Sequence, residues 1–302
     1  MQDTTLSSAL KIIAQHTDHL VLSRIPESFS KKSKSDAPAF IASIIDLETM
    51  GLNPDQDEII EIGLLSFSFT NQEGIVEVTQ QYNALQEPSI PIPQEITKIT
   101  GITNDEVKGK SIDWELVGRY IAQSHLIICH NSGFDRNFLE HQTPPFIQAI
   151  VQKRAFGCSQ KDINWTLLGY ESSKLEYLNF KLGFFYDGHR ALTDCWATLN
   201  LLTKQEGAFD ELKANVRKKQ SLLCAENTSF EKKDLLKDRG YRWSDGKGGL
   251  PKCWYIIVDG DALSEETQWL NTEIYGREGV AEKLKTLNIN AYNRYSSRAY
   301  RL

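Results

Sequence analysis

The pattern of apolar and polar positions predicts a long α/β region followed by a shorter region with its own core. Three early runs have the apolar or alternating character of strands: residues 40–45 (FIASII), 58–69 (EIIEIGLLSFSF) and 74–85 (GIVEVTQQYNAL). Two further short runs, 126–131 (LIICHN) and 154–159 (RAFGCS), are typical of buried strands. Three early strands followed by alternating helices and strands predict an α/β sheet with helices on its faces.

Helical spacing of apolar residues predicts the elements that cover this sheet. The clearest helices are residues 113–123 (DWELVGRYIAQ), 132–142 (SGFDRNFLEHQ) and 190–205 (RALTDCWATLNLLTKQ). Residues 145–152 and 174–183 are further helices. Because these helices alternate with the later strands, we expect them to lie on both faces of the sheet.

The segments on either side of the α/β region differ from it. Residues 5–25 predict a helix and a short strand, and the Ser-, Lys- and Pro-rich segment 26–38 is typical of a linker. After about Ser221, strand and helix patterns alternate again and indicate a small α+β module. The predicted division is an N-terminal helical extension and linker at 1–36, a main domain at 37–206 and a C-terminal accessory module at 207–302.

Composition excludes several classes of protein. Hydrophobic residues make up 40% of the chain and charged residues 25%, which is ordinary for a soluble globular protein. No run of eighteen apolar residues and no secretory signal is found, so we expect no contact with a membrane and a cytoplasmic location. The five cysteines form no CxxC pair, which favours reduced thiols over a disulfide framework or a zinc site.

Charge limits where nucleic acid would bind. The net charge of −6 argues against affinity for nucleic acid over the whole surface. The stretch from Lys213 to Lys247 is nevertheless locally basic. A nuclease is compatible with both facts, because a site made of carboxylates adds negative charge by itself.

Asp46 and Glu48 follow directly on the first predicted strand. Positions i and i+2 of a strand point to the same face, so the two carboxylates project together from its carboxyl end. Ligands bind at that edge in open α/β sheets. Neighbouring carboxylates repel one another unless a cation lies between them, and Mg²⁺ or Mn²⁺ prefers such oxygen ligands. Two surface acids at a strand end are the alternative.

Asp135 follows the strand at 126–131 and allows two interpretations. Ser132 and Asp135 fit an S-x-x-D capping box, with Asp135 at the third helical position. Asp135 is also placed to be a third carboxylate at the start of a helix beside the first strand. The two roles are compatible, because the first turn of a capped helix can present a side chain to a site.

His189 and Asp194 lie in the segment YDGHRALTDC. A helix turns about 100° per residue, so five positions separate two side chains by about 140°. If both face one site, His189 must precede the helix, and Asp194 then projects from its second turn. A half-exposed histidine near a helix start is the alternative.

These motifs together resemble the DEDDh exonucleases, the group that includes the proofreading epsilon subunit of bacterial DNA polymerase III. The resemblance runs from Phe40 to Gln205 and is carried by IIDLETMGL, PIPQEITKITGITNDEV, CHNSGFDRNFL and DGHRALTDC. Position 190 is Arg rather than Tyr, which assigns the histidine subgroup. The resemblance implies a ribonuclease-H-like fold, with a mixed five-stranded sheet flanked by helices.

The resemblance also implies a mechanism. Two Mg²⁺ or Mn²⁺ ions about 3.5–4 Å apart would lie between the carboxylates and the scissile phosphate. Asp46 would bridge them, Glu48 and Asp194 would support them, and Asp135 would act largely through bound water. His189 would take a proton from the attacking water, a task that suits an imidazole near neutral pH. The products would be nucleoside 5′-monophosphates released from the 3′ end.

Four positions are expected to bind substrate. In the family the segment after the first motif contacts the 3′-terminal nucleotide, so Thr49, Met50 and Leu52 are candidates, with Met50 or Leu52 as an apolar wedge. Packing in the core is the alternative for Leu52. Asn131 is expected either to cap the following helix or to position substrate.

Several alternatives stay open at this point. The resemblance favours DNA, single-stranded or overhanging, over RNA, and an exoribonuclease that trims RNA 3′ ends is the alternative. A polymerase-associated nucleic-acid-binding module is a third, although a binder gains nothing from four clustered acids that repel phosphate. The tail NAYNRYSSRAYRL suits stacking on bases or packing. The C-terminal module is a candidate site for a polymerase or another protein partner, and the oligomeric state is open.

Overall fold

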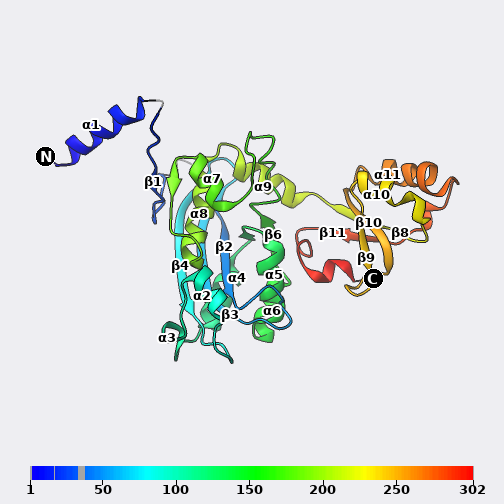
Figure 1. Ribbon diagram of the computed structural model, residues 1–302, viewed down its shortest axis with the longest axis horizontal. Coiled ribbons are helices and arrows are strands. Elements are labelled where there is room, and N and C mark those ends of the chain that lie inside the picture. The colour runs from blue at the N-terminus through cyan, green and yellow to red at the C-terminus, as the bar shows by residue number, and fades with distance from the viewer. Residues whose placement is uncertain (1, 17, 33–37, 302) are drawn as a thin grey trace.

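A mixed five-stranded sheet forms the centre of the protein, as predicted. The computed structural model describes residues 2–16, 18–32 and 38–301 (Figure 1). The strand order is β4-β3-β2-β5-β6, in which β2 pairs antiparallel with β3 and parallel with β5. The strands are β2 (Phe40–Thr49), β3 (Ile59–Thr70), β4 (Gly74–Leu85), β5 (Leu126–Cys129) and β6 (Ala155–Cys158).

Helices cover both faces of this sheet. The alternation of side chains along β2 assigns each position to one face: Ile44 lies in a cluster with Cys195, whereas Ile45 lies in a cluster with Phe138. On the Ile44 face lie α7 (Leu175–Lys181), α8 (Ala191–Lys204) and α9 (Ala208–Arg217). On the Ile45 face lie α4 (Trp114–Gln123), α5 (Ser132–His141) and α6 (Pro145–Val151). Even-numbered positions of β2 therefore face α8.

Two short helices connect β4 to α4. They are α2 (Gln94–Thr100) and α3 (Asn104–Val107). Gly101 ends α2 in the left-handed conformation, with φ of 72°, which glycine adopts without a steric penalty. Thr103 and Glu106 then form a capping box that starts α3.

The N-terminal helix α1 (Gln2–Ala14) projects away from the sheet in Figure 1. Its side chains Leu6 and Ile12 are each 60% exposed. None of the described helices is long and apolar enough to cross a membrane.

The segment after α1 is attached to the main domain. Strand β1 (Ser23–Arg24) pairs parallel with β7 (Phe184–Phe185), and Ile25 is buried. Farther along, the Phe29 carbonyl accepts the N–H of Val78 at 3.0 Å. The first part of the predicted linker thus lies along β4, and residues 33–37 of that linker lie outside the described residues.

The C-terminal module has an α+β fold, as predicted. Its antiparallel sheet has the order β11-β8-β10-β9. Its strands are β8 (Gln220–Ala225), β9 (Arg242–Asp245), β10 (Lys252–Asp259) and β11 (Thr286–Ile289). One face is covered by α10 (Lys233–Asp238), α11 (Leu263–Trp269) and a π-helical turn at Leu270–Tyr275. Short 3₁₀ helices lie at Phe230–Lys232, Ala281–Lys283 and Ser297–Tyr300.

Helix α9 links the two folded parts. Its residues Leu212 and Val216 belong to the same hydrophobic cluster as β2 and α8. An added Cβ at Gly157 of β6 would lie 2.8 Å from a Val216 methyl group, so α9 lies directly on the sheet. By packing, α9 belongs with the five-stranded sheet, although it follows the predicted division at residue 206.

Candidate active site

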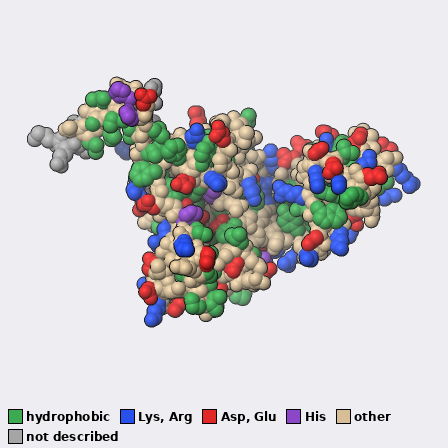
Figure 2. Space-filling view, in the orientation of Figure 1, with side chains coloured by type: hydrophobic (Ala, Val, Ile, Leu, Met, Phe, Trp, Pro, Cys, Tyr) green, Lys and Arg blue, Asp and Glu red, His purple; other side chains and the backbone are tan. Residues whose placement is uncertain are grey.

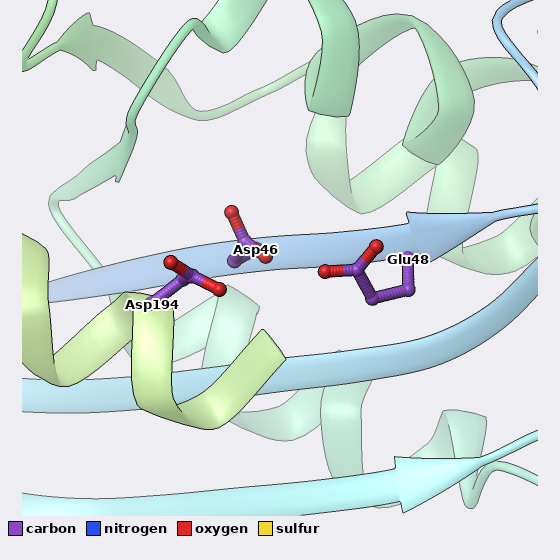
Figure 3. A group of neighbouring side chains, drawn as sticks. All are labelled: Asp46, Glu48 and Asp194. Carbon is purple, nitrogen blue, oxygen red and sulfur yellow. The ribbon is translucent and has the colours of Figure 1, made fainter. Parts of the chain in front are cut away.

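Three carboxylates meet at the carboxyl end of β2. Asp46 and Glu48 project from the strand towards Asp194 at the start of α8 (Figure 3), and ligand oxygens of all three lie within 4.8 Å of one another. The convergence follows from the fold, because even-numbered positions of β2 face the layer that contains α8. The structure therefore brings together the two motifs that lie farthest apart in the predicted site.

Gly63 allows α8 to approach the sheet this closely. It is the partner of Asp46 in the β2–β3 register. A Cβ at Gly63 would lie 2.3 Å from the backbone carbonyl carbon of Ala191, a distance that no side chain tolerates. Ala191, the first residue of α8, therefore packs directly against the backbone of Gly63, opposite Asp46.

Glu61 is a site residue that the sequence analysis missed. Its carboxylate is fully buried on β3, opposite Glu48. It accepts hydrogen bonds from the Arg190 guanidinium (3.0 Å), the Ala191 N–H (3.1 Å) and the Asn83 amide (3.0 Å). The signal was an acid inside an otherwise apolar strand pattern, since an acid at such a position is rare unless it is paired.

His189 precedes α8, as predicted. It is exposed and has a positive φ of 62°, and the N-cap residue Arg190 follows it. The Arg190 N–H donates to the Asp194 carboxylate at 3.1 Å. The expected position of Asp194 was wrong: α8 begins at Ala191, so Asp194 lies in its first turn and not its second.

Burial and mutual repulsion raise the pKa values of the site carboxylates when no cation is bound. Burial raises the pKa of Asp46 well above its usual range, and the charges of Asp135, Asp194 and Glu48 add to this effect. Burial also raises the pKa of Glu48 to about 8 and that of Asp194 to about 6. A divalent cation among these carboxylates would offset their mutual repulsion and favour their charged forms. The donor set therefore fits Mg²⁺ or Mn²⁺.

Asp135 reaches β2 from the opposite helical layer. It is almost fully buried on α5, and its Oδ1 accepts the Leu47 N–H at 3.2 Å. Burial raises its pKa to about 8, although the hydrogen bond from the Leu47 N–H acts to lower it. It thus contacts the strand between Asp46 and Glu48, outside the group of three carboxylates that meet within 4.8 Å.

The predicted capping box at α5 was wrong. The N-cap residue is Asn131, whose side chain makes no capping hydrogen bond. Ser132 is already inside the helix, and its hydroxyl donates to the Gly157 carbonyl at 2.5 Å. Asn131 has a left-handed backbone, with φ of 79°, which asparagine tolerates better than most residues. Of its two expected roles, side-chain capping is therefore excluded.

Of the candidate substrate residues at and beyond the end of β2, Thr49 and Met50 are buried and Leu52 is exposed. The Thr49 hydroxyl donates to the Gly51 carbonyl at 2.6 Å. Met50 is buried in a cluster with Ile60, a position that favours packing in the core over contact with a nucleotide. Leu52 is 84% exposed, which excludes core packing and leaves it as the wedge candidate.

The C-terminal tail packs against the main domain. Arg294 and the Tyr295 hydroxyl both bind the Asp162 carboxylate, at 3.2 and 2.6 Å. These two side chains are therefore held by Asp162 and do not form a surface on which bases could stack. Tyr292 is 57% exposed.

Comparison with known sequences identifies relatives for the first part of the chain. The family model RNase_T, described as exonuclease, matches residues 43–202. The chain is 28% identical over 173 residues to the PolC-type DNA polymerase III of Thermotoga petrophila, covering 53% of this chain but only 11% of that polymerase. It is 28% identical over 166 residues to DNA polymerase III subunit epsilon of Treponema pallidum, covering 52% of this chain and 73% of the subunit.

Solved structures also match. Exonuclease X in complex with 5′ overhanging duplex DNA is 22% identical, with a TM-score of 0.42, and covers 58% of this chain and 99% of its own. Exonuclease I of E. coli in complex with an oligonucleotide is 15% identical, with a TM-score of 0.47, and covers 72% of this chain and 63% of its own.

Proposed function

This chain belongs to the RNase_T exonuclease family, which its residues 43–202 match, and from that premise we propose that it is a 3′→5′ exonuclease. It would remove nucleoside 5′-monophosphates from the 3′ end of DNA, single-stranded or overhanging. The observation that carries the proposal is the meeting of Asp46, Glu48 and Asp194 within 4.8 Å at a sheet edge. Three half-buried acids that repel one another contribute nothing to the stability of the fold, but they bind cations well.

The carboxylates would hold two divalent cations, Mg²⁺ or Mn²⁺, which supply Lewis acidity at the scissile phosphate. Asp46 lies close to both Glu48 and Asp194 and would be the central ligand of the ions. Glu48 and Asp194 would help to hold the ions. Asp135 supports β2 through Leu47 and would act largely through water.

His189 would accept the proton of the attacking water. Its position supports this role in two ways. It is exposed, so water and substrate can reach it, and it lies five residues before Asp194 on the same turn into α8. A general base of this kind contributes about 10²–10⁴-fold in rate.

Leu52 would wedge against the terminal bases, because it is 84% exposed just beyond the carboxylates on the chain. Thr49 and Asn131 would contact the terminal nucleotide. The names of the relatives, which are DNA polymerase III chains, support DNA as the substrate and a polymerase as a partner.

The C-terminal module would contact the rest of the substrate strand. Residues 218–301 contain fifteen Lys and Arg against twelve Asp and Glu, whereas the whole chain is acidic. Figure 2 shows Lys and Arg side chains on the surface of this module, among acidic ones. Phosphate contacts of this kind supply affinity without sequence preference.

Matched DNA and RNA oligonucleotides test the proposal. Each would carry a 5′ label and be offered single-stranded, recessed and overhanging, with Mg²⁺ or with EDTA. We expect a ladder that shortens from the 3′ end, mononucleotide 5′-phosphates as products, and faster degradation of DNA.

Asp46→Asn controls for contaminating nucleases, because it removes one charge without changing the size of the side chain. Degradation that persists in EDTA or in Asp46→Asn would refute the proposal. Faster degradation of RNA than of DNA would leave the exonuclease proposal standing but would show that RNA is the preferred substrate.

A further inference from the structure

Arg136 is the largest fully buried side chain described in the protein, and it directly follows Asp135. Its guanidinium does not face the active site. It donates to the carbonyls of Tyr292 (2.5 Å) and Arg294 (2.8 Å) in the C-terminal tail. It also pairs with Glu140 at 2.9 Å on the same helix. A buried guanidinium with this many partners fixes the backbone that it binds, because leaving any donor unpaired is costly.

The same face of α5 binds the tail at two more positions. Glu140 accepts both the Nε and the Nη2 of Arg298, at 3.0 and 2.9 Å. The Asn137 side-chain oxygen accepts the Ser297 N–H at 2.8 Å. Three residues of one helix therefore bind a segment that lies about half the chain away in sequence.

The tail also covers the edge of the main sheet. The Phe156 N–H of edge strand β6 donates to the Ala291 carbonyl at 2.8 Å. In Figure 1 the tail returns from the C-terminal module towards β6 and α5. The segment 291–298, which we name the α5 clasp, is thus held by both a helix and a strand of the exonuclease domain.

These contacts hold α5 from two sides. Asp135 binds β2 through Leu47, and Arg136 binds the α5 clasp. Successive residues of a helix point about 100° apart, so the two anchors fix both the rotation of α5 about its axis and its shift along that axis. Without the clasp, α5 would keep the Asp135 anchor, the hydrogen bond from Ser132 to Gly157 and its apolar contacts, but no anchor on the Arg136 side.

We propose that the α5 clasp positions Asp135 and so makes the C-terminal module a working part of the exonuclease centre. Arg136 and Arg298 are positioning residues in this arrangement, and neither reaches the reacting atoms. The inference rests on the proposed function, since it assigns the module a role in the same site.

Arg298→Met in the full-length chain is the test variant. Arg298 is 30% exposed, so the protein should fold without it, whereas replacement of the fully buried Arg136 risks unfolding. Arg301→Met is the matched control, because Arg301 is an exposed arginine three residues along the same tail. Both variants lose one positive charge, so any general loss of attraction for nucleic acid is the same.

Two readouts separate positioning from substrate binding. The first is steady-state mononucleotide release: for Arg298→Met we expect kcat to fall by at least about tenfold with KM nearly unchanged, because misplaced groups lose rate rather than ground-state binding. The second is hydrogen exchange of the Leu47 amide, which binds Asp135. We expect faster exchange there in Arg298→Met and wild-type behaviour in Arg301→Met.

Wild-type kcat in Arg298→Met, or a fall in kcat without faster exchange at Leu47, would overturn the inference. The exchange experiment needs no activity. If the wild-type chain degrades no oligonucleotide, the proposed function fails, and exchange at Leu47 still decides whether the clasp positions Asp135.

Discussion

Asp46 is a residue whose charge destabilises the protein when no cation is bound and would bind the cation when one is present. Its carboxylate is held near Glu48 and Asp194, and burial disfavours its charged form. We expect Asp46→Asn to reduce Mg²⁺-dependent exonuclease activity to background and to raise the melting temperature in EDTA, because the repulsion is gone. Calorimetry in EDTA and in Mg²⁺ measures this. A lower melting temperature in EDTA would contradict the electrostatic account.

The pKa shifts of the site predict a pH dependence of stability in the absence of cations. Burial raises the pKa of Glu48 to about 8 and that of Asp194 to about 6. Unfolded carboxyl groups titrate near pH 4, so between about pH 4 and pH 8 the folded state holds protons that the unfolded chain has released. The free energy of unfolding therefore falls as pH rises through this window.

We expect the denaturant midpoint in EDTA to decrease from pH 5 to pH 8, and Glu48→Gln to flatten this slope. Mg²⁺ should remove most of the decrease, because a cation that binds only the folded state stabilises it. Urea titrations at matched ionic strength measure the effect. An unchanged slope in Glu48→Gln would show that other groups cause it.

His189 is separable from the carboxylates by experiment. It is exposed and lies outside the cluster of three acids. We expect His189→Ala to lower kcat by about 10²–10⁴-fold. The increase in melting temperature on adding Mg²⁺ should be retained, because the carboxylates are intact. Comparison of kcat and melting temperature in the two proteins tests this, and an unchanged kcat would exclude His189 as the base.

At the scale of elements, the approach of α8 to β3 determines whether the site closes. Gly63→Ala would place a methyl group 2.3 Å from the Ala191 backbone. Overpacking of this kind costs about 1–3 kcal/mol. We expect both lower stability and lower activity, since Asp194 moves away from Asp46 with its helix. Gly248→Ala is the control, because its Cβ would meet no atom within 4 Å.

Local patterns predicted the elements that carry the site but not how they meet. The alternation in β2 predicted that Asp46 and Glu48 share a face, and helix geometry predicted that His189 precedes α8. The capping box at Ser132 was wrong because a left-handed Asn131 starts α5 one residue earlier. The short strand β11 was missed because its four residues alternate over too short a run to be distinguished from a loop.

Glu61 and Arg136 were missed for a common reason. Each is a charged residue whose partners lie far away in sequence: Glu61 binds Arg190, and Arg136 binds the tail near Arg294. Periodicity reports which face of an element is buried, but it does not report which distant backbone comes to that face. The partners of buried charges of this kind can therefore be identified only once the fold brings them together.

At the scale of the whole molecule, the two ends of the chain differ in how they attach to the exonuclease domain. The C-terminal tail returns to α5 and β6 through charged and backbone hydrogen bonds. The N-terminal extension is exposed in its first part and packs against the domain in its second part. Helix α1 exposes Leu6 and Ile12, whereas Ile25 and Phe29 lie against the main core.

Two truncations test this difference. Removal of residues 1–21 deletes α1 and should change neither exonuclease activity nor the urea midpoint, because Leu6, Leu10, Ile12 and Ile13 of this helix are all exposed. Removal of residues 1–31 also deletes β1 and the buried Ile25. Burying one aliphatic side chain contributes roughly 1.5–3 kcal/mol, so we expect the longer truncation to lose at least that much stability. Equal losses in both proteins would mean that α1 itself contacts the domain in solution.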